Sequence, residues 1–159
     1  AGVARRHPAQ AAKVLSRTVA LRRALYGLFK NALDGSQPAP AYLDVLSREL
    51  AIARQHQKLS PADRRFHWKW DRPQRALDCI LWRVCQSAAD LLTSSELSQV
   101  RRCGGPDCGW MFLDTSRNHS RRWCDMQDCG NLVKVRRFRE RSAKAYSLAS
   151  KRRQTASKT

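Results

Sequence analysis

Four cysteines in the C-terminal half of the sequence have the spacing of metal ligands. They form two pairs with four residues between the members of each: Cys103 with Cys108, and Cys124 with Cys129. A zinc ion binds four thiolates tetrahedrally, which requires two short-range pairs that the chain brings together. The glycines and proline in CGGPDC favour a tight turn in which backbone amides point at sulfur. The sequence therefore predicts one structural zinc ion with four sulfur ligands and no open coordination position.

Two disulfides are the alternative use of these cysteines, and they are typical of short secreted chains. The N-terminus has no apolar signal segment, which favours the metal site. His119 is the only candidate substitute ligand, and we expect it to be a turn residue. The other two cysteines, Cys79 and Cys85, lie in an apolar helical stretch and are predicted to be buried packing residues without a metal or redox role.

The residues between the two cysteine pairs, GWMFLDTSRNHSRRW, have the length of a short hairpin. We expect Trp110 and Phe112 before a turn at SRNH, with Trp123 after it.

The chain after Cys129 turns strongly basic and has helical periodicity from Asn131 onward. Val135 and Phe138, with Leu132 at the margin, are expected to pack back onto the zinc hairpin. A different face of the predicted helix carries a basic stripe. The stripe consists of Lys134, Arg137, Arg141 and Lys144. Because the last cysteine would fix the start of this helix, the stripe would be presented at a set angle, as nucleic-acid readers require.

Composition points to the same class of partner. The formal net charge is +18 and the isoelectric point about 10.8, more than solubility requires. Nucleic acid is the leading partner and an acidic membrane surface the second. The sequence has no run of about 18 apolar residues, so we predict a cytoplasmic protein without a membrane partner. No nucleophile, base and orienting group, and no phosphate-binding loop, can be assembled, so we predict that it is not an enzyme.

The N-terminal part of the sequence is predicted to be helical. Apolar residues recur at helical spacing from Pro8 to about Leu33, from about Ala41 to His56, and from Asp71 to about Leu92. In RFHWKW, Phe66, Trp68 and Trp70 alternate with basic residues, which indicates a half-buried strand with its aromatic side chains facing inward. A surface that stacks on single-stranded nucleic acid is the alternative interpretation of this pattern.

The predicted fold is mainly α with a small β contribution. We expect a helical domain over residues 1–100, a zinc finger with a basic helix over 101–146, and a disordered basic tail over 147–159.

The segment from Cys103 to Asn131 resembles a known family. It reads C-x4-C-x-W-x-F-x-D-x-S-R-N-x-S-R-R-W-C-x-M-x-x-C-G-N, which is similar to the CGNR-type zinc finger. The resemblance implies a treble-clef-like finger with the four cysteines as ligands, in a bacterial stress-related transcription regulator. The helical region ahead of it is similar in order and length to the ABATE domain that precedes this finger in the family. One departure is Leu132, which stands where the family name has Arg.

Taken together, the basic helix and the resemblance predict a regulator that binds duplex DNA at the bacterial nucleoid. We assign phosphate contacts to four arginines: Arg121, Arg122, Arg136 and Arg139. We assign groove contacts to Asn131, Lys134, Arg137 and Arg141, with Lys144 completing the stripe. One alternative is structured or ribosomal RNA. The other is a zinc-stabilised module that docks on the transcription machinery, with RNA polymerase or another protein contacted by the N-terminal domain.

Overall fold

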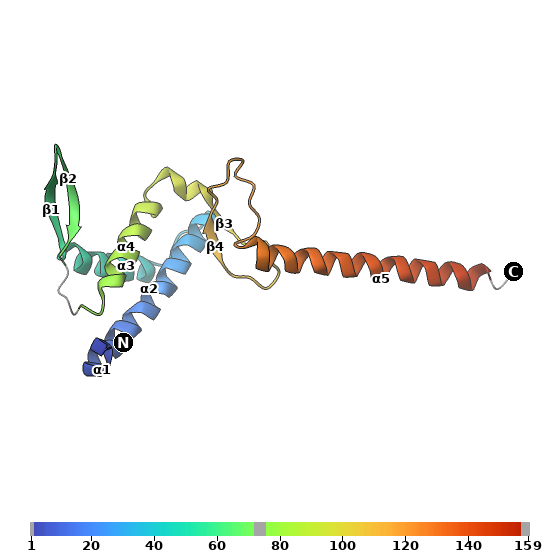
Figure 1. Cartoon of the computed structure of the whole chain (residues 1–159), viewed down its shortest axis with the longest axis horizontal. Helices are drawn as coiled ribbons and strands as arrows, with labels where there is room; N and C mark the ends of the chain where they lie inside the picture. Colours follow the sequence, from blue (N-terminus) through green and yellow to red (C-terminus); the bar gives the residue numbers. More distant parts are fainter. Residues whose placement is uncertain (1, 72–75, 157–159) are drawn as a thin grey trace. The chain divides into compact units, whose positions relative to one another are not determined.

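The computed structural model describes residues 2–71 and 76–156. The chain divides into two compact units, Ala1–Ser98 and Gln99–Thr159. The first unit contains four helices and a β-hairpin, and the second contains a small sheet, the four clustered cysteines and a long helix (Figure 1). The prediction of a mainly helical fold with a small β contribution and a zinc finger is confirmed.

The first two predicted helices of the first unit begin and end close to the predicted positions. A short helix α1 (Gly2–Arg6) precedes α2 (Pro8–Asp34), and α3 (Pro40–Arg54) follows. Pro8 occupies the first turn of α2, where the backbone amide that proline lacks would have no helical partner. Gly35 ends α2 in the left-handed conformation, with φ of 64°, and its amide bonds the carbonyl of Asn31.

Helix α4 (Cys79–Leu92) begins later than the predicted Asp71. Asp71 ends the preceding hairpin instead: its amide bonds the carbonyl of His56 at 2.7 Å, and its carboxylate lies 2.5 Å from Lys58 Nζ. The Lys58 ammonium lowers the pKa of Asp71. Residues 72–75, which fall in the predicted first turn, lie outside the described residues.

Helices α2, α3 and α4 enclose one apolar core. Its buried side chains include Leu21, Leu28, Leu46, Leu81 and Trp82. The ring of His56 stacks on Trp82 with a centroid distance of 3.8 Å, and Trp70 lies near Trp82 from the end of the hairpin. Cys85 is fully buried in this core and half-buried Cys79 packs against it, so both are packing residues as predicted.

Gly27 on α2 leaves room for the ring of Tyr42 on α3. A Cβ atom at this position would lie 2.2 Å from Cε2 of Tyr42. In most helix interiors, Gly→Ala stabilises by up to about 1 kcal/mol. We expect the opposite sign here: Gly27→Ala should lower the free energy of unfolding by about 1–3 kcal/mol through overpacking, measured by urea denaturation. Combining it with Tyr42→Leu should recover part of the loss, and two simply additive losses would contradict the assignment.

An ion network links the same helices. Arg17 on α2 forms two contacts with the carboxylate of Glu49 on α3, at 2.7 and 3.0 Å, and one at 2.9 Å with Asp78 at the start of α4. Glu49 is buried, and the hydrogen bonds that Arg17 donates to Glu49 and to Asp78 raise the pKa of Arg17 despite partial desolvation. Sequence periodicity gave no signal for this network.

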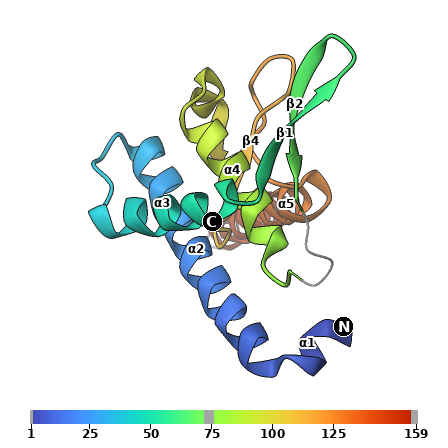
Figure 2. The same cartoon turned by 90° about the vertical axis from the view of Figure 1, so that its left-hand side faces the viewer.

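The hairpin of the first unit pairs β1 (Gln57–Ala62) with β2 (Arg65–Trp70) in an antiparallel register that places Leu59 opposite Trp68. The strand in RFHWKW is confirmed, whereas β1 was not predicted. The expected inward packing of the aromatic residues is wrong for two of them. Phe66 is 70% exposed and Trp68 65%, because the hairpin extends away from the helices (Figure 2).

A 3-10 turn, η1 (Ser95–Gln99), lies at the end of the first unit, and the first strand of the second unit is β3 (Val100–Arg102). β3 pairs with β4 (Met111–Leu113). The predicted hairpin between 110–112 and Trp123 is therefore wrong: β4 pairs backward across the first cysteine turn. The amide of Cys103 continues this ladder to the carbonyl of Trp110 at 2.9 Å.

The second unit ends in a π-helical turn, η2 (Met126–Gly130), that passes directly into α5 (Asn131–Ala156). Helix α5 differs from prediction at its end, because it continues through residues 147–156, where we expected a disordered tail (Figure 1). This segment is poor in apolar residues but rich in Ala, Lys, Arg and Gln, which favour helix without any core. The last three residues of that predicted tail lie outside the described residues.

Candidate metal centre and nucleic-acid interface

The structure brings the four predicted zinc ligands together. The sulfur atoms of Cys103, Cys108, Cys124 and Cys129 all lie within 4.8 Å of one another. The Cys108–Cys124 and Cys124–Cys129 sulfur distances are both 3.7 Å. Four ligands about 2.3 Å from a central zinc ion are about 3.8 Å apart in a regular tetrahedron. The cluster therefore has the dimensions of a four-thiolate zinc site, and all four cysteines are unpaired thiols.

The backbone supports the cluster as the sequence predicts. Amides of Gly105 and Cys124 point at the sulfur of Cys103, at 3.4 and 3.3 Å. Gly105 also leaves room for the ligands: a Cβ there would lie 3.1 Å from Cβ of Cys108 and 3.4 Å from the sulfur of Cys129. The turn between the first two ligands is thus closed around the metal position, and the four cysteines are able to hold one zinc ion.

Ionisation of the thiols is unequal within the cluster. Desolvation opposes ionisation of Cys103, but the amides of Cys124 and Gly105 outweigh it and lower its pKa to about 7. Hydrogen bonding to the thiols of Cys108 and Cys124 raises the pKa of Cys129. A bound dication supplies the charge that keeps all four sulfurs deprotonated. Cys103 therefore ionises more easily than Cys129.

The loop between the cysteine pairs is organised by Asp114, which sequence reasoning missed. Its fully buried carboxylate accepts hydrogen bonds from the amide and hydroxyl of Ser116 and from the amide of Arg121. The Ser116 hydroxyl is the main cause of the lowered pKa of Asp114. The signal was present in the sequence as D-x-S, since Asp commonly bonds the backbone two residues on. His119 lies in this loop with φ of 45° and not among the sulfur ligands, which confirms that it is a turn residue.

Two arginines assigned to phosphate contacts lie in the same loop. The guanidinium of Arg121 donates to the carbonyls of Trp123 and Cys124 and lies 4.8 Å from the centre of the Phe112 ring. These contacts give Arg121 a structural role beside a zinc ligand. The exposed Arg122 lies over the ring of Trp123 at 5.7 Å. Contact of either residue with phosphate stays a prediction.

The start of α5 is fixed by the metal centre. Asp125 caps η2, because its carboxylate accepts hydrogen bonds from the amides of Gln127 and Asp128 at 2.7 and 3.0 Å. Cys129 lies inside this turn and Asn131 is the first residue of α5. A zinc ion held by Cys129 therefore anchors the N-terminal end of the helix.

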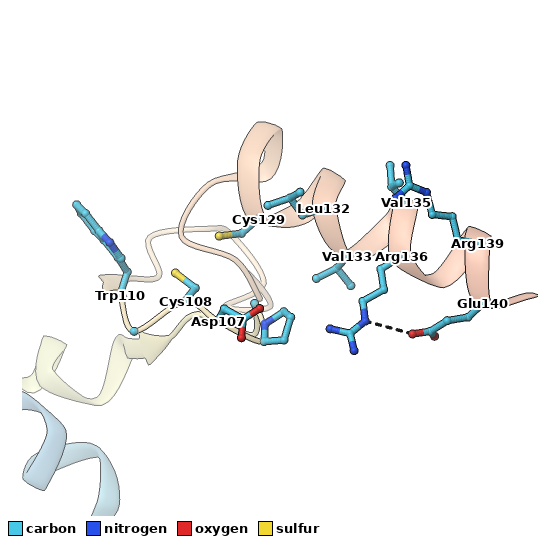
Figure 3. Close-up of a pocket in the computed structure, with 13 residues that line it drawn as sticks. Asp107, Cys108, Trp110, Cys129, Leu132, Val133, Val135, Arg136, Arg139 and Glu140 are labelled. Atoms are coloured by element: carbon cyan, nitrogen blue, oxygen red, sulfur yellow. Dashed lines mark hydrogen bonds and ion pairs between the residues drawn. The ribbon is translucent and has the colours of Figure 1, made fainter.

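The basic residues of α5 from Lys134 to Lys144 are exposed and fall on more than one face. The predicted stripe is brought together, since Lys134, Arg137, Arg141 and Lys144 line one hollow along the helix with Glu140. Arg136 lies elsewhere on the helix and pairs with Glu140 at 3.2 Å. Figure 3 shows this pair beside Arg139.

An apolar groove lies between the first cysteine turn and α5. It has a volume of about 700 Å³, and its lining includes Trp110, Leu132, Val133 and Val135 (Figure 3). The predicted packing of Leu132, Val135 and Phe138 onto the finger is wrong, because these side chains are 47–69% exposed. Of the apolar residues of α5 that line the groove, Val133 is half-buried. The helix rises about 1.5 Å per residue, so its successive turns lie farther from the loops around its start.

The fold and the cysteine site define a zinc-finger protein with a helical N-terminal unit. The family model of the CGNR zinc finger matches residues 99–142. The ABATE model, described as "Putative stress-induced transcription regulator", matches residues 1–95, more than half of the chain. The chain belongs to this family, and the resemblance seen in its sequence is confirmed. At the level of the family, it is a transcription regulator with a zinc finger, which implies nucleic acid as its partner.

A comparison with curated proteins gives no match. Within the described residues, no helix has an apolar stretch long enough to cross a membrane.

Proposed function

We propose that this chain is a bacterial transcription regulator that binds duplex DNA through the basic stripe of α5, at the nucleoid and without catalysis. The observation that carries the proposal is the hollow lined by Lys134, Arg137, Arg141 and Lys144, on a helix whose first turn is held by the metal centre. Glu140 is the one acidic residue in its lining. An exposed concentration of cations of this kind matches the charge of a phosphate backbone.

The spacing of the stripe suits a helix that lies against DNA. Its residues are separated by three, four and three positions, which keeps them on one side of an α-helix. The major groove of B-DNA is about 12 Å wide and admits one α-helix. Anchoring at Cys129 favours a defined approach, because a helix fixed at one end loses less orientational freedom on binding.

Affinity and sequence choice are assigned to different side chains. We assign neutralisation of phosphates to Arg121 and Arg122 in the loop between the cysteine pairs and to Arg136 and Arg139 on α5, which would supply affinity without sequence information. Asn131, Arg137 and Arg141 are the candidates for contacts with base edges. Arg is suited to bidentate contacts with guanine and Asn to contacts with adenine.

The test is the salt dependence of binding to a duplex, measured by fluorescence anisotropy on zinc-loaded protein. Each lost phosphate contact should flatten the plot of log affinity against log salt by about 0.9. A lost base contact should cost about 1–3 kcal/mol on the preferred site and relax discrimination there. We expect Arg137→Ala and Arg141→Ala to weaken binding strongly, whereas Lys13→Ala, an exposed cation on α2, should have little effect.

The same measurements separate the alternatives. If the stripe variants bind duplex DNA as tightly as the parent and with the same salt slope, α5 does not face DNA. Preferential binding of ribosomal RNA over duplex in competition would favour a structured-RNA protein. Binding of a protein that survives high salt would favour docking on the transcription machinery, for which the exposed apolar groove beside Trp110 and Leu132 is a suitable surface.

A further inference from the structure

The hairpin of the N-terminal unit leaves a strongly apolar face exposed. Leu59, Phe66 and Trp68 lie on the same side of β1 and β2, because Leu59 is the register partner of Trp68 and Phe66 is two residues away. All three are more than half exposed. Side chains of this size are normally buried in a core or cover a binding surface. The face therefore requires an explanation that the duplex-binding helix does not give.

A groove beside this face combines aromatic and cationic groups. Trp68 and Trp70 line it together with Lys58 and Lys69 from the two strands and Arg83 from α4. Ser60, His67 and Asp71 complete the lining. Lys58 and Lys69 are register partners on the face of the ribbon opposite Leu59 and Trp68, and the groove includes Trp68 and Trp70 together with them. Indole rings and ammonium or guanidinium groups are thus accessible in one place.

We propose that the hairpin and this groove bind unpaired bases of single-stranded nucleic acid. Proteins that bind single strands place aromatic rings where successive bases can stack, beside cations that follow the phosphates. Phe66 and Trp68 are two residues apart on one strand, hence about 7 Å apart along it. That separation leaves each ring accessible to its own base. Lys69 and Arg83, which line the adjacent groove, supply charges for the phosphates of the strand, whereas Lys58 is paired with Asp71.

Charge decides between this ligand and a second copy of the chain. The hairpin segment 57–71 contains four Lys and Arg residues and two Asp residues, one of which, Asp71, is paired with Lys58. Two copies that met through this face would bring like charges together, in a protein that already carries a net charge of +18. A polyanion instead gains from the same charges.

The site is separate from the proposed duplex contact and does not depend on it. It belongs to the unit Ala1–Ser98, whereas α5 belongs to Gln99–Thr159. Binding of single strands at the hairpin and of duplex at α5 can therefore be lost independently, and a set of variants in each region distinguishes them.

The experiment measures anisotropy of fluorescein-labelled oligo(dT), oligo(U) and a DNA duplex with full-length, zinc-loaded protein. Phe66→Ala and Trp68→Ala should each weaken single-strand binding by about 5- to 150-fold, the loss expected for one stacked base. Trp68→Phe should retain most of the affinity, because it keeps an aromatic ring. Leu15→Ala, which removes an equally exposed apolar side chain from α2, should change nothing. The oligo(dT) and oligo(U) arms show whether DNA or RNA is preferred.

A second variant tests whether weaker binding could result from misfolding of the hairpin. Lys69→Ala keeps all the aromatic rings, and it should flatten the salt plot for single strands by about 0.7 if Lys69 contacts a phosphate. Unchanged single-strand affinity in both aromatic variants would overturn the proposal. So would sedimentation data in which Trp68→Ala dissociates a dimer, since the face would then be covered by a second copy. Loss of duplex binding in Arg137→Ala with single-strand binding intact would support both sites.

Discussion

Cys129→Ser is expected to release the zinc ion and unfold the metal-binding unit. Cys129 supplies one of four sulfurs in a cluster of tetrahedral dimensions, and it lies in the π-helical turn that leads into α5. Structural zinc binding contributes on the order of 10 kcal/mol in zinc-finger peptides, and this energy stabilises the folded state. Metal analysis should find one zinc per parent chain and much less in the variant. Circular dichroism should show a parallel loss of helix, because α5 loses its anchor.

The matched control is a double variant that changes the two cysteines outside the cluster. Cys79→Ala with Cys85→Val should retain the full zinc content, since both side chains pack in or against the helical core. Its cost is limited to lost packing of a small buried group. Stoichiometric zinc in Cys129→Ser, or zinc loss in the double variant, would show that the ligand set is wrong.

Acidification should have the same effect as the ligand substitution. Zinc binds thiolates, so protons compete with the metal, and affinity falls as pH falls. Even Cys103, whose pKa is lowered to about 7 in the metal-free cluster, is mostly protonated below neutral pH. Zinc release should therefore increase as pH drops below neutrality, which a chromophoric chelator can follow. Retention that is independent of pH would contradict thiolate ligation.

The parts of the structure that sequence predicted well are determined by local interactions. The bounds of α2 follow from Pro8 and Gly35, whose backbone preferences act within one turn. The zinc ligands were recognisable because each cysteine pair is closed by a short turn, and the metal then requires the two pairs to meet. The stripe on α5 depends only on helical periodicity.

The errors arise where distant segments meet. The partner of β4 is β3, on the far side of the first cysteine turn, and strand pairing is not encoded in the alternation of either strand. The alternation in RFHWKW indicated a strand correctly, but alternation also predicted a buried face for Phe66 and Trp68. Burial depends on which other segments cover the face. The hairpin extends away from the helical core, so these two side chains stay exposed. Asp114 and Glu49 were missed for a related reason: a single buried carboxylate leaves no periodic pattern.

The second prediction with a large expected effect concerns the buried carboxylate of Glu49. Arg17→Ala should lower the free energy of unfolding by about 2–4 kcal/mol, because it leaves a buried carboxylate without its cation. We expect less than the loss seen for fully buried pairs, since the Arg17 side chain is 31% exposed and solvent screens part of the interaction. Arg17→Lys should lower the free energy of unfolding by an intermediate amount. An ammonium retains the charge but cannot make the two parallel hydrogen bonds to Glu49. Arg23→Ala, on the exposed side of the same helix, is the control and should change stability little.

The strongest form of this test replaces the whole network. Arg17→Met combined with Glu49→Leu and Asp78→Asn removes all three charges together, so no buried ion is left unpaired, and most of the lost stability should return. Urea unfolding at saturating zinc measures all the variants with the metal-binding unit equally folded. If the single variant Arg17→Ala is as stable as Arg23→Ala, the carboxylate of Glu49 is solvated or paired elsewhere. Helices α2, α3 and α4 would then be held together by the apolar core around Leu28 and Trp82 without a contribution from these ions.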